Sequence, residues 1–192
     1  MRAKSTGGGV EGADGHGSIS AGYSLGNPIS GLSVTFSTSI TGIDPFGDAG
    51  SFSLSASRLL RAGGSSATFV GASGSNLGSW GAGSDDVMYS AYTSHLVGFQ
   101  ARGIEVPVQL VAGYGTKNTR NVADVLEDGA FAGVAIGLTP NISGSISFTE
   151  TQVNTGFNVS IPNTSASVSF GVYDVTDNTE RRQLSLSVGY GF

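Results

Sequence analysis

Apolar and small polar residues alternate along most of this chain. In the final segment LSLSVGYGF (184–192), every second residue is apolar and the residues between are serine or glycine. A period of two is typical of a strand whose two faces meet different surroundings. The same alternation returns in GLSVTFSTSI (31–40), SFSLSAS (51–57), NISGSISF (141–148) and SASVSFGVY (165–173). The pattern therefore predicts an all-β protein with one apolar and one polar face.

Helical periodicity is missing, and β-branched and aromatic residues concentrate in the alternating segments, as strand propensity predicts. The alternation gives eleven candidate strands. They lie near residues 17–25, 30–41, 50–60, 65–73, 86–100, 103–115, 129–139, 141–151, 156–162, 164–174 and 181–192.

The predicted connections alternate between tight turns and longer loops. A meander of this kind is typical of an antiparallel up-and-down β-barrel. Because bacterial membrane barrels have even strand numbers, we expect ten or twelve strands, within a range of about 10–12. Residues 1–15 would be a flexible N-terminal segment or the first strand, and residues 16–192 would form a single barrel domain.

Composition restricts what the apolar face can meet. Only 12% of the 192 residues are charged, against about a quarter in ordinary soluble domains. Two assignments follow: the apolar face meets lipid and the Ser/Gly/Thr face encloses a wet lumen, or the apolar faces pack together inside a soluble barrel or sandwich. The net charge of −5, with scattered basic residues, argues against nucleic acid as a partner.

Three features favour lipid. The predicted strands carry almost no Lys or Glu on the polar face, although a soluble sheet needs charge there to prevent edge association. The chain ends on an aromatic residue, where the terminus of a soluble domain would fray. Aromatic residues also stand near the predicted strand ends, as the interfacial girdles of membrane barrels require. These are Tyr23, Tyr114, Tyr173, Tyr190 and Phe192.

The final segment LSLSVGYGF, with Tyr190 and the terminal Phe192, resembles the C-terminal signal of bacterial outer-membrane β-barrel proteins. The resemblance implies a porin-like transmembrane barrel in the bacterial outer membrane, inserted by the assembly machinery that reads this signal. Its other partners would be the lipid bilayer and lipopolysaccharide. The first 17 residues contain no apolar stretch like that of a secretory signal. If the protein is exported, we therefore expect that a signal peptide has been removed.

If the apolar face meets lipid, the alternate positions line a pore. Glu105 would be a rare negative charge there, or it would neutralise Arg102 beside the neighbouring turn. The predicted pore-lining residues are Ser33, Thr35, Ser37, Ser53, Ser55, Glu105, Gln109, Ser145, Ser147, Ser167, Ser169 and Ser185.

Acidic residues collect at the end of the predicted sheet that carries the longer loops. They form either ordinary solvated loops or an acidic mouth that concentrates cations or holds divalent ions at lipid phosphates. The predicted mouth consists of Asp44, Asp48, Asp85, Asp86, Asp124, Glu127, Asp128, Asp174 and Asp177.

Little in the sequence supports catalysis, a metal or a cofactor. The segment HGS (16–18) is similar in spacing to outer-membrane phospholipases, and GSDD (83–86) to outer-membrane aspartate proteases, but the accompanying Asn and Asp-His patterns are absent. We therefore expect no enzyme activity. Trp80 would anchor at the membrane interface or contact a ligand.

Serine, glycine and alanine are too small to fill a barrel of ten or more strands, so we expect a water-filled lumen. The expected function is passive diffusion of small hydrophilic solutes, with a weak preference for cations. The alternative is a non-conducting structural or adhesive barrel, or a soluble Ser/Gly-rich β-protein, that acts through its loops.

Overall fold

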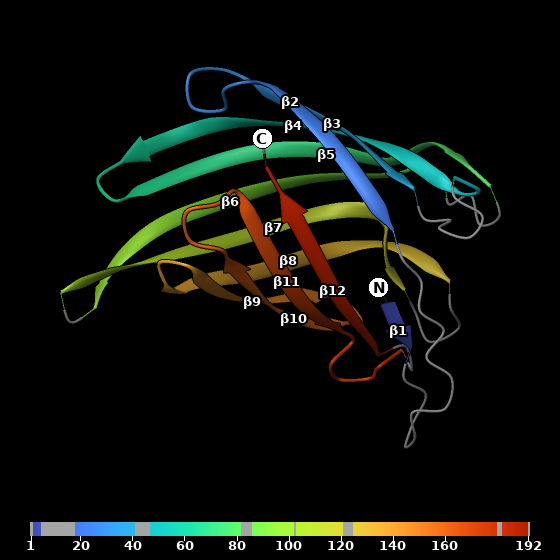
Figure 1. Cartoon of the computed structure of the whole chain (residues 1–192). Coiled ribbons are helices and arrows are strands. Elements are labelled where there is room, and N and C mark those ends of the chain that lie inside the picture. Colours follow the sequence, from blue (N-terminus) through green and yellow to red (C-terminus); the bar gives the residue numbers. More distant parts are fainter. Residues whose placement is uncertain are drawn as a thin grey trace.

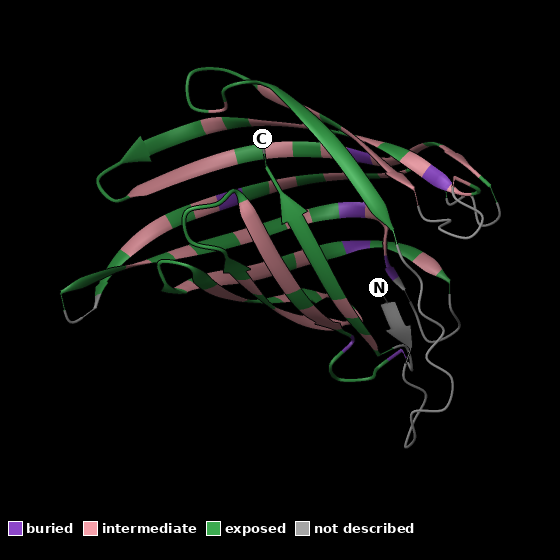
Figure 2. Cartoon of the chain, in the orientation of Figure 1, coloured by how far each residue is buried: buried purple, intermediate pink, exposed green. Residues whose placement is uncertain are grey.

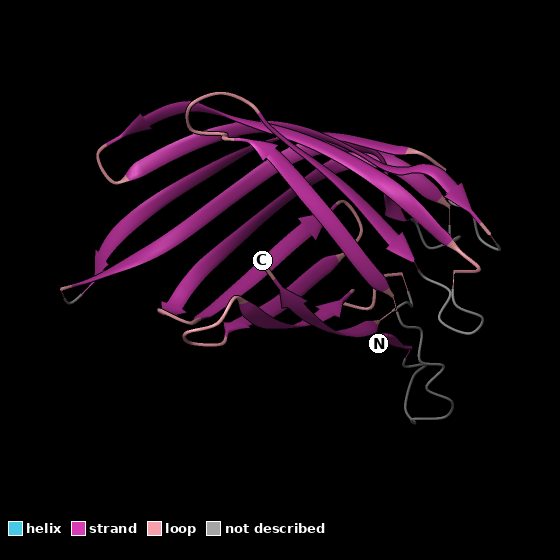
Figure 3. Cartoon of the chain, turned by 45° about the horizontal axis from the view of Figure 1, so that its top comes forward, coloured by secondary structure: helices cyan, strands magenta, loops and turns pink. Residues whose placement is uncertain are grey.

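The structure is a computed structural model of the chain, and it describes residues 2–4, 18–40, 47–81, 86–101, 103–120, 125–179 and 182–191. The described residues form strands and contain no helix (Figure 3). The strands are β1 (Arg2–Lys4), β2 (Ile19–Gly26), β3 (Ser33–Ile40), β4 (Gly50–Gly63), β5 (Ser66–Trp80), β6 (Met88–Ala101), β7 (Ile104–Arg120), β8 (Leu126–Thr139), β9 (Ile142–Thr149), β10 (Val153–Ser160), β11 (Ala166–Tyr173) and β12 (Gln183–Tyr190).

Each of the eleven predicted strands overlaps one of the strands β2 to β12, so the all-β prediction is confirmed. The short β1 adds a twelfth strand within residues 1–15, which we expected to be a flexible segment or a first strand. In the described part of the chain, no helix is long and apolar enough to cross a membrane.

All strands belong to one antiparallel sheet in the order β1-β12-β11-β10-β9-β8-β7-β6-β5-β4-β3-β2. From β2 to β12 each strand pairs with its neighbours in sequence, which confirms the meander, and Figure 1 shows the sheet as one curved layer. The even-numbered strands from β2 to β12 all run in the same direction. We use the name "loop end" for the edge of the sheet where these strands start, and "turn end" for the edge where they stop.

The predicted closed barrel is not seen among the described residues. The sheet has two edges, β1 and β2, and no pairing that the structure describes joins them. Residues 5–17, which connect these two strands, lie outside the described ranges. The observed fold is therefore an open, curved antiparallel sheet.

Two strands run further than their turn signals predicted. The predicted strand 65–73 stops before the glycine-containing residues 74–80, but β5 continues through them to Trp80, with Asn76 and Gly78 at positive φ. β7 continues to Arg120 through a register shift against β8 between Gly115 and Thr119. The turn-forming residues are accommodated by these positive-φ positions and this register shift, and the neighbouring strands continue to pair on either side. This is the usual effect of a β-bulge.

The burial of the two faces is reversed relative to a soluble protein. No hydrophobic residue in the described ranges is buried. Val188 is 75% exposed and Tyr23 is 68% exposed, whereas serines at alternate positions, such as Ser53 and Ser185, are half-buried. Figure 2 shows how few buried residues the sheet contains. Within the described part of the chain, no layer of protein therefore covers the apolar face.

Candidate functional site

The polar residues of neighbouring strands lie on one face, which we call the serine face. The register pairs Ser33 with Ser57, Thr35 with Ser55, and Gln109 with Ala135, which in turn pairs with Ser145. Following these pairs across the sheet brings together all twelve residues that the sequence predicted to line a pore. They are Ser33, Thr35, Ser37, Ser53, Ser55, Glu105, Gln109, Ser145, Ser147, Ser167, Ser169 and Ser185.

Side chains on the serine face bond to one another across the strands. The hydroxyls of Ser73 and Ser90 are 2.8 Å apart. Asn158 Nδ2 donates to Ser169 Oγ at 2.8 Å, from β10 to β11. Each hydroxyl keeps further capacity to donate or accept, so the face can be hydrated without carrying charge.

A hollow of about 270 Å³ opens on the serine face over β9 to β12, and we call it the serine hollow. Ser145, Asn158, Ser169 and Ser185 contribute to its lining, which includes no charged residue from the described ranges. A hollow that spans four strands of one layer requires a concave surface. The serine face is therefore the concave side of the sheet, and the apolar face is the convex side.

Bulkier side chains cover the concave side between β5 and β8, which sequence reasoning missed. A Cβ atom added at Gly71 would lie 2.5 Å from the ring of Tyr92, so this ring lies over the glycine of the neighbouring strand. The ring of Phe131 lies over Gly113 in the same way. The signal was available in the sequence, because Tyr92 and Phe131 occupy the parity that elsewhere holds serine and glycine.

Of the nine residues predicted to form an acidic mouth, Asp44, Asp85 and Asp124 lie outside the described residues. The other six lie at the loop end: Asp48, Asp86, Glu127, Asp128, Asp174 and Asp177. Several of these carboxylates have local partners. Asp86 Oδ2 lies 2.6 Å from Lys117 Nζ, and Asp177 Oδ2 lies 3.8 Å from Arg182 Nη2.

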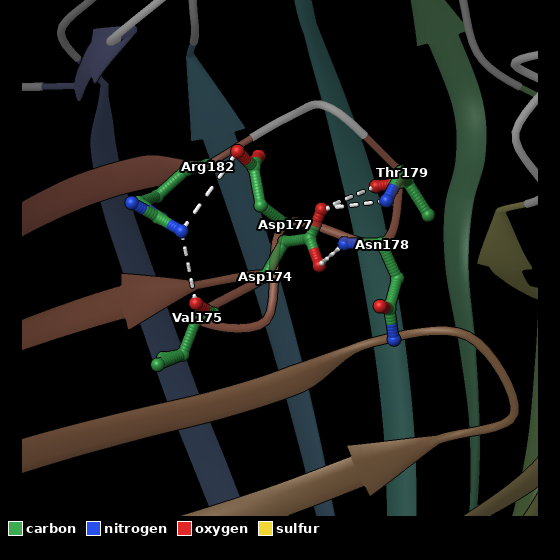
Figure 4. Close-up of polar contacts among 6 residues, drawn as sticks. All are labelled: Asp174, Val175, Asp177, Asn178, Thr179 and Arg182. Atoms are coloured by element: carbon green, nitrogen blue, oxygen red, sulfur yellow. Dashed lines mark hydrogen bonds and ion pairs between the residues drawn. The ribbon is translucent and has the colours of Figure 1, made fainter. Parts of the chain in front are cut away.

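Asp174 is fully buried and holds the loop between β11 and β12 (Figure 4). Its Oδ1 accepts from Asn178 N at 3.0 Å, and its Oδ2 accepts from Thr179 N at 3.0 Å and from Thr179 Oγ1 at 2.7 Å. Gln152 Nε2 donates to Thr179 Oγ1 at 3.0 Å, which ties this loop to the connection between β9 and β10. The charge of Asp174 therefore stabilises the loop, as buried carboxylates with several donors do.

Trp80, for which the sequence allowed an interfacial or a ligand-binding role, belongs to an aromatic cluster at the loop end. Its Nε1 donates to Gly47 O at 3.1 Å, and its ring centroid lies 5.4 Å from that of Phe52. The ring of Phe52 lies 5.6 Å from that of Phe36 on the apolar face. These contacts hold the Trp80 ring in place at the loop end.

The remaining candidates are spread over the sheet. Glu105 lies against Gly98 of the neighbouring strand, and Arg102, its expected partner, is outside the described residues. Tyr190 is 71% exposed, whereas Phe192 and His16 lie outside the described ranges. His95, the second of the two histidines in the sequence, places its Nδ1 2.9 Å from Thr68 Oγ1.

In the described ranges, no group of three or more His, Asp or Glu side chains is arranged to hold a metal ion. The serine face is a concave surface that is rich in hydroxyl groups and carries the carboxylate of Glu105, and it lies opposite an exposed apolar face. Comparisons of the chain with protein-family models, with curated proteins and with solved structures find no match.

Proposed function

We propose that this chain forms a β-barrel channel in the bacterial outer membrane and allows small hydrophilic solutes to diffuse through it. The observation that carries the proposal is the reversed burial of the two faces. Large apolar side chains such as Val188 and Tyr190 are exposed on the convex side, while the concave side carries serines. Exposed apolar patches of this extent are unusual in soluble monomers but are required on the lipid-facing side of a membrane barrel.

The directions of the strands support closure into a barrel. β2 and β12 both run from the loop end to the turn end, so direct pairing between them would be parallel. β1 is antiparallel to β12 and therefore runs in the opposite direction to both. Pairing of β1 with β2 would close an antiparallel barrel of twelve strands and would remove two open edges, which membrane-spanning sheets cannot leave unpaired.

A closed barrel of twelve strands would have a hydrated lumen on its concave side. The serines and glycines of the serine face are too small to fill it, and they offer hydrogen bonds to water. The net charge of −5 gives the channel a weak preference for cations. The resemblance of the last nine residues to the outer-membrane assembly signal supports the same location.

Single-channel recording tests this function. The refolded protein is inserted into a planar bilayer with a KCl gradient, and we expect stepwise openings with a reversal potential of mild cation preference. The variant Ser145→Arg adds a positive charge to the concave side and should shift the reversal potential toward anion preference. A protein that inserts but stays silent would favour the non-conducting barrel, and one that stays soluble without detergent would contradict the proposal.

A further inference from the structure

A second hollow, of about 410 Å³, opens on the concave side over β5 to β9, and we call it the amphipathic hollow. Met88, Val111 and Phe131 give it an apolar lining. Ser90 and Ser147 add hydroxyl groups. Its size falls within the range of small-molecule sites, which combine an apolar lining with a few convergent polar groups.

An unpaired amide stands in the wall of this hollow. Asn118 lines it, and the Nδ2 and Oδ1 atoms of that side chain are both buried without a hydrogen-bond partner. Asn118 lies within the register shift of β7, directly after Lys117, whose φ is +52°. Buried polar atoms without partners are rare and costly in proteins, and such irregular segments often mark a functional site.

The lining of the amphipathic hollow offers no free charge. Among the described residues that line it, Lys117 is the one that is charged, and the Nζ atom of that side chain lies 2.6 Å from Asp86 Oδ2. An anionic ligand would have to compete with this ion pair, and a cationic ligand would meet no lining carboxylate. The hollow is therefore suited to an uncharged molecule.

We propose that the amphipathic hollow is a binding subsite for a neutral carbohydrate. The proposal rests on the proposed function, because it takes the concave side to be a hydrated solute path. Sugar hydroxyls both donate and accept, as do the Asn118 amide and the serine hydroxyls. The C–H face of a sugar ring matches the apolar lining of Val111 and Phe131. Because the terminal torsion of asparagine is broad, the amide can turn toward a ligand hydroxyl at little cost.

Isothermal titration of the full refolded chain tests the subsite without requiring conduction. The detergent is zwitterionic, because a sugar-based detergent would compete. The probes are glucose, its anionic analogue glucuronate, which keeps the sugar ring, and its cationic analogue glucosamine. We expect saturable heat with glucose and much weaker heat with the two charged analogues. Equal binding of glucuronate or glucosamine, or no saturable heat with glucose, would overturn the proposal.

A pair of variants separates recognition from folding. Asn118→Leu removes both amide atoms at nearly constant size, and we expect glucose affinity to fall about tenfold. The matched control Asn158→Leu changes an asparagine on the same face that lines the serine hollow and is already bonded to Ser169. That control should leave glucose affinity unchanged. Unaltered affinity in Asn118→Leu, with the folded state verified by circular dichroism, would contradict the assignment.

The titration and the bilayer recording can fail separately. Glucose binding by a protein that gives no current would retain the subsite and reject the channel. Current without glucose binding would retain the channel and reject the subsite.

Discussion

The convex and concave sides of this sheet differ in chemistry and in burial. On β12, Leu186 is 51% exposed on the convex side, while Ser185 on the concave side is half-buried. A soluble sheet covers its apolar face, because that burial drives folding. Here the described residues bury no hydrophobic side chain. The proposed channel explains this difference, because lipid would cover the apolar face of a membrane barrel.

The largest difference between the convex and concave sides is expected in the loss of stability caused by a charge added in the middle of β12. Leu186→Arg places a guanidinium on the convex side, and we expect a loss of about 2–4 kcal/mol in the free energy of unfolding from vesicles. Ser187→Arg changes the next residue, on the concave side, and should cost far less. Urea unfolding of both variants in lipid vesicles measures the contrast, and equal losses would break it.

At the loop end, the buried carboxylate of Asp174 can be compared with the exposed carboxylate of Asp86. Asp174→Asn replaces an acceptor oxygen by an amide that cannot accept from the Thr179 donors, and we expect it to lower stability by about 1.5–3 kcal/mol. Asp86→Asn removes an exposed ion pair and should cost less than about 1 kcal/mol. Thermal unfolding in detergent measures both, and a larger effect at Asp86 would show that the loops depend on exposed charge.

Glycines on the two sides should respond differently to an added methyl group. At Gly71 a Cβ would lie 2.5 Å from the Tyr92 ring and 2.9 Å from Ala56 O, so we expect Gly71→Ala to cost about 1–3 kcal/mol. At Gly144 the nearest atom is 3.6 Å away, and Gly144→Ala should be neutral or slightly stabilising. Urea midpoints of the two variants test this, and a tolerated Gly71→Ala would refute the close packing of Tyr92.

The smallest expected effect concerns the hydroxyl pairs of the concave side. Ser73→Ala removes the partner of Ser90 and should cost about 0.5–1.5 kcal/mol. Ser187→Ala, at a position with no such pair among the bonds described, should change stability by less. Chemical unfolding in the same detergent distinguishes them, and identical midpoints would mean that water replaces the pair without loss.

Period-two alternation predicted the strands and the residues of the serine face, because side-chain direction in a strand follows directly from sequence position. It did not predict the continuation of β5 through residues 74–80, because pairing with neighbouring strands outweighs the local preference of glycine and asparagine. The role of Asp174 was also missed. Its partners Asn178 and Thr179 are near in sequence, but its burial depends on the connection between β9 and β10.

Cysteine scanning along β12 tests most directly whether the convex side meets lipid and the concave side meets water. The chain contains no cysteine, so single substitutions at positions 184 to 188 each give one reactive site. In proteoliposomes, we expect a membrane-impermeant thiol reagent to label positions 185 and 187 and to leave 184, 186 and 188 unlabelled. Labelling at all five positions, or at the apolar ones alone, would contradict the lipid-facing assignment.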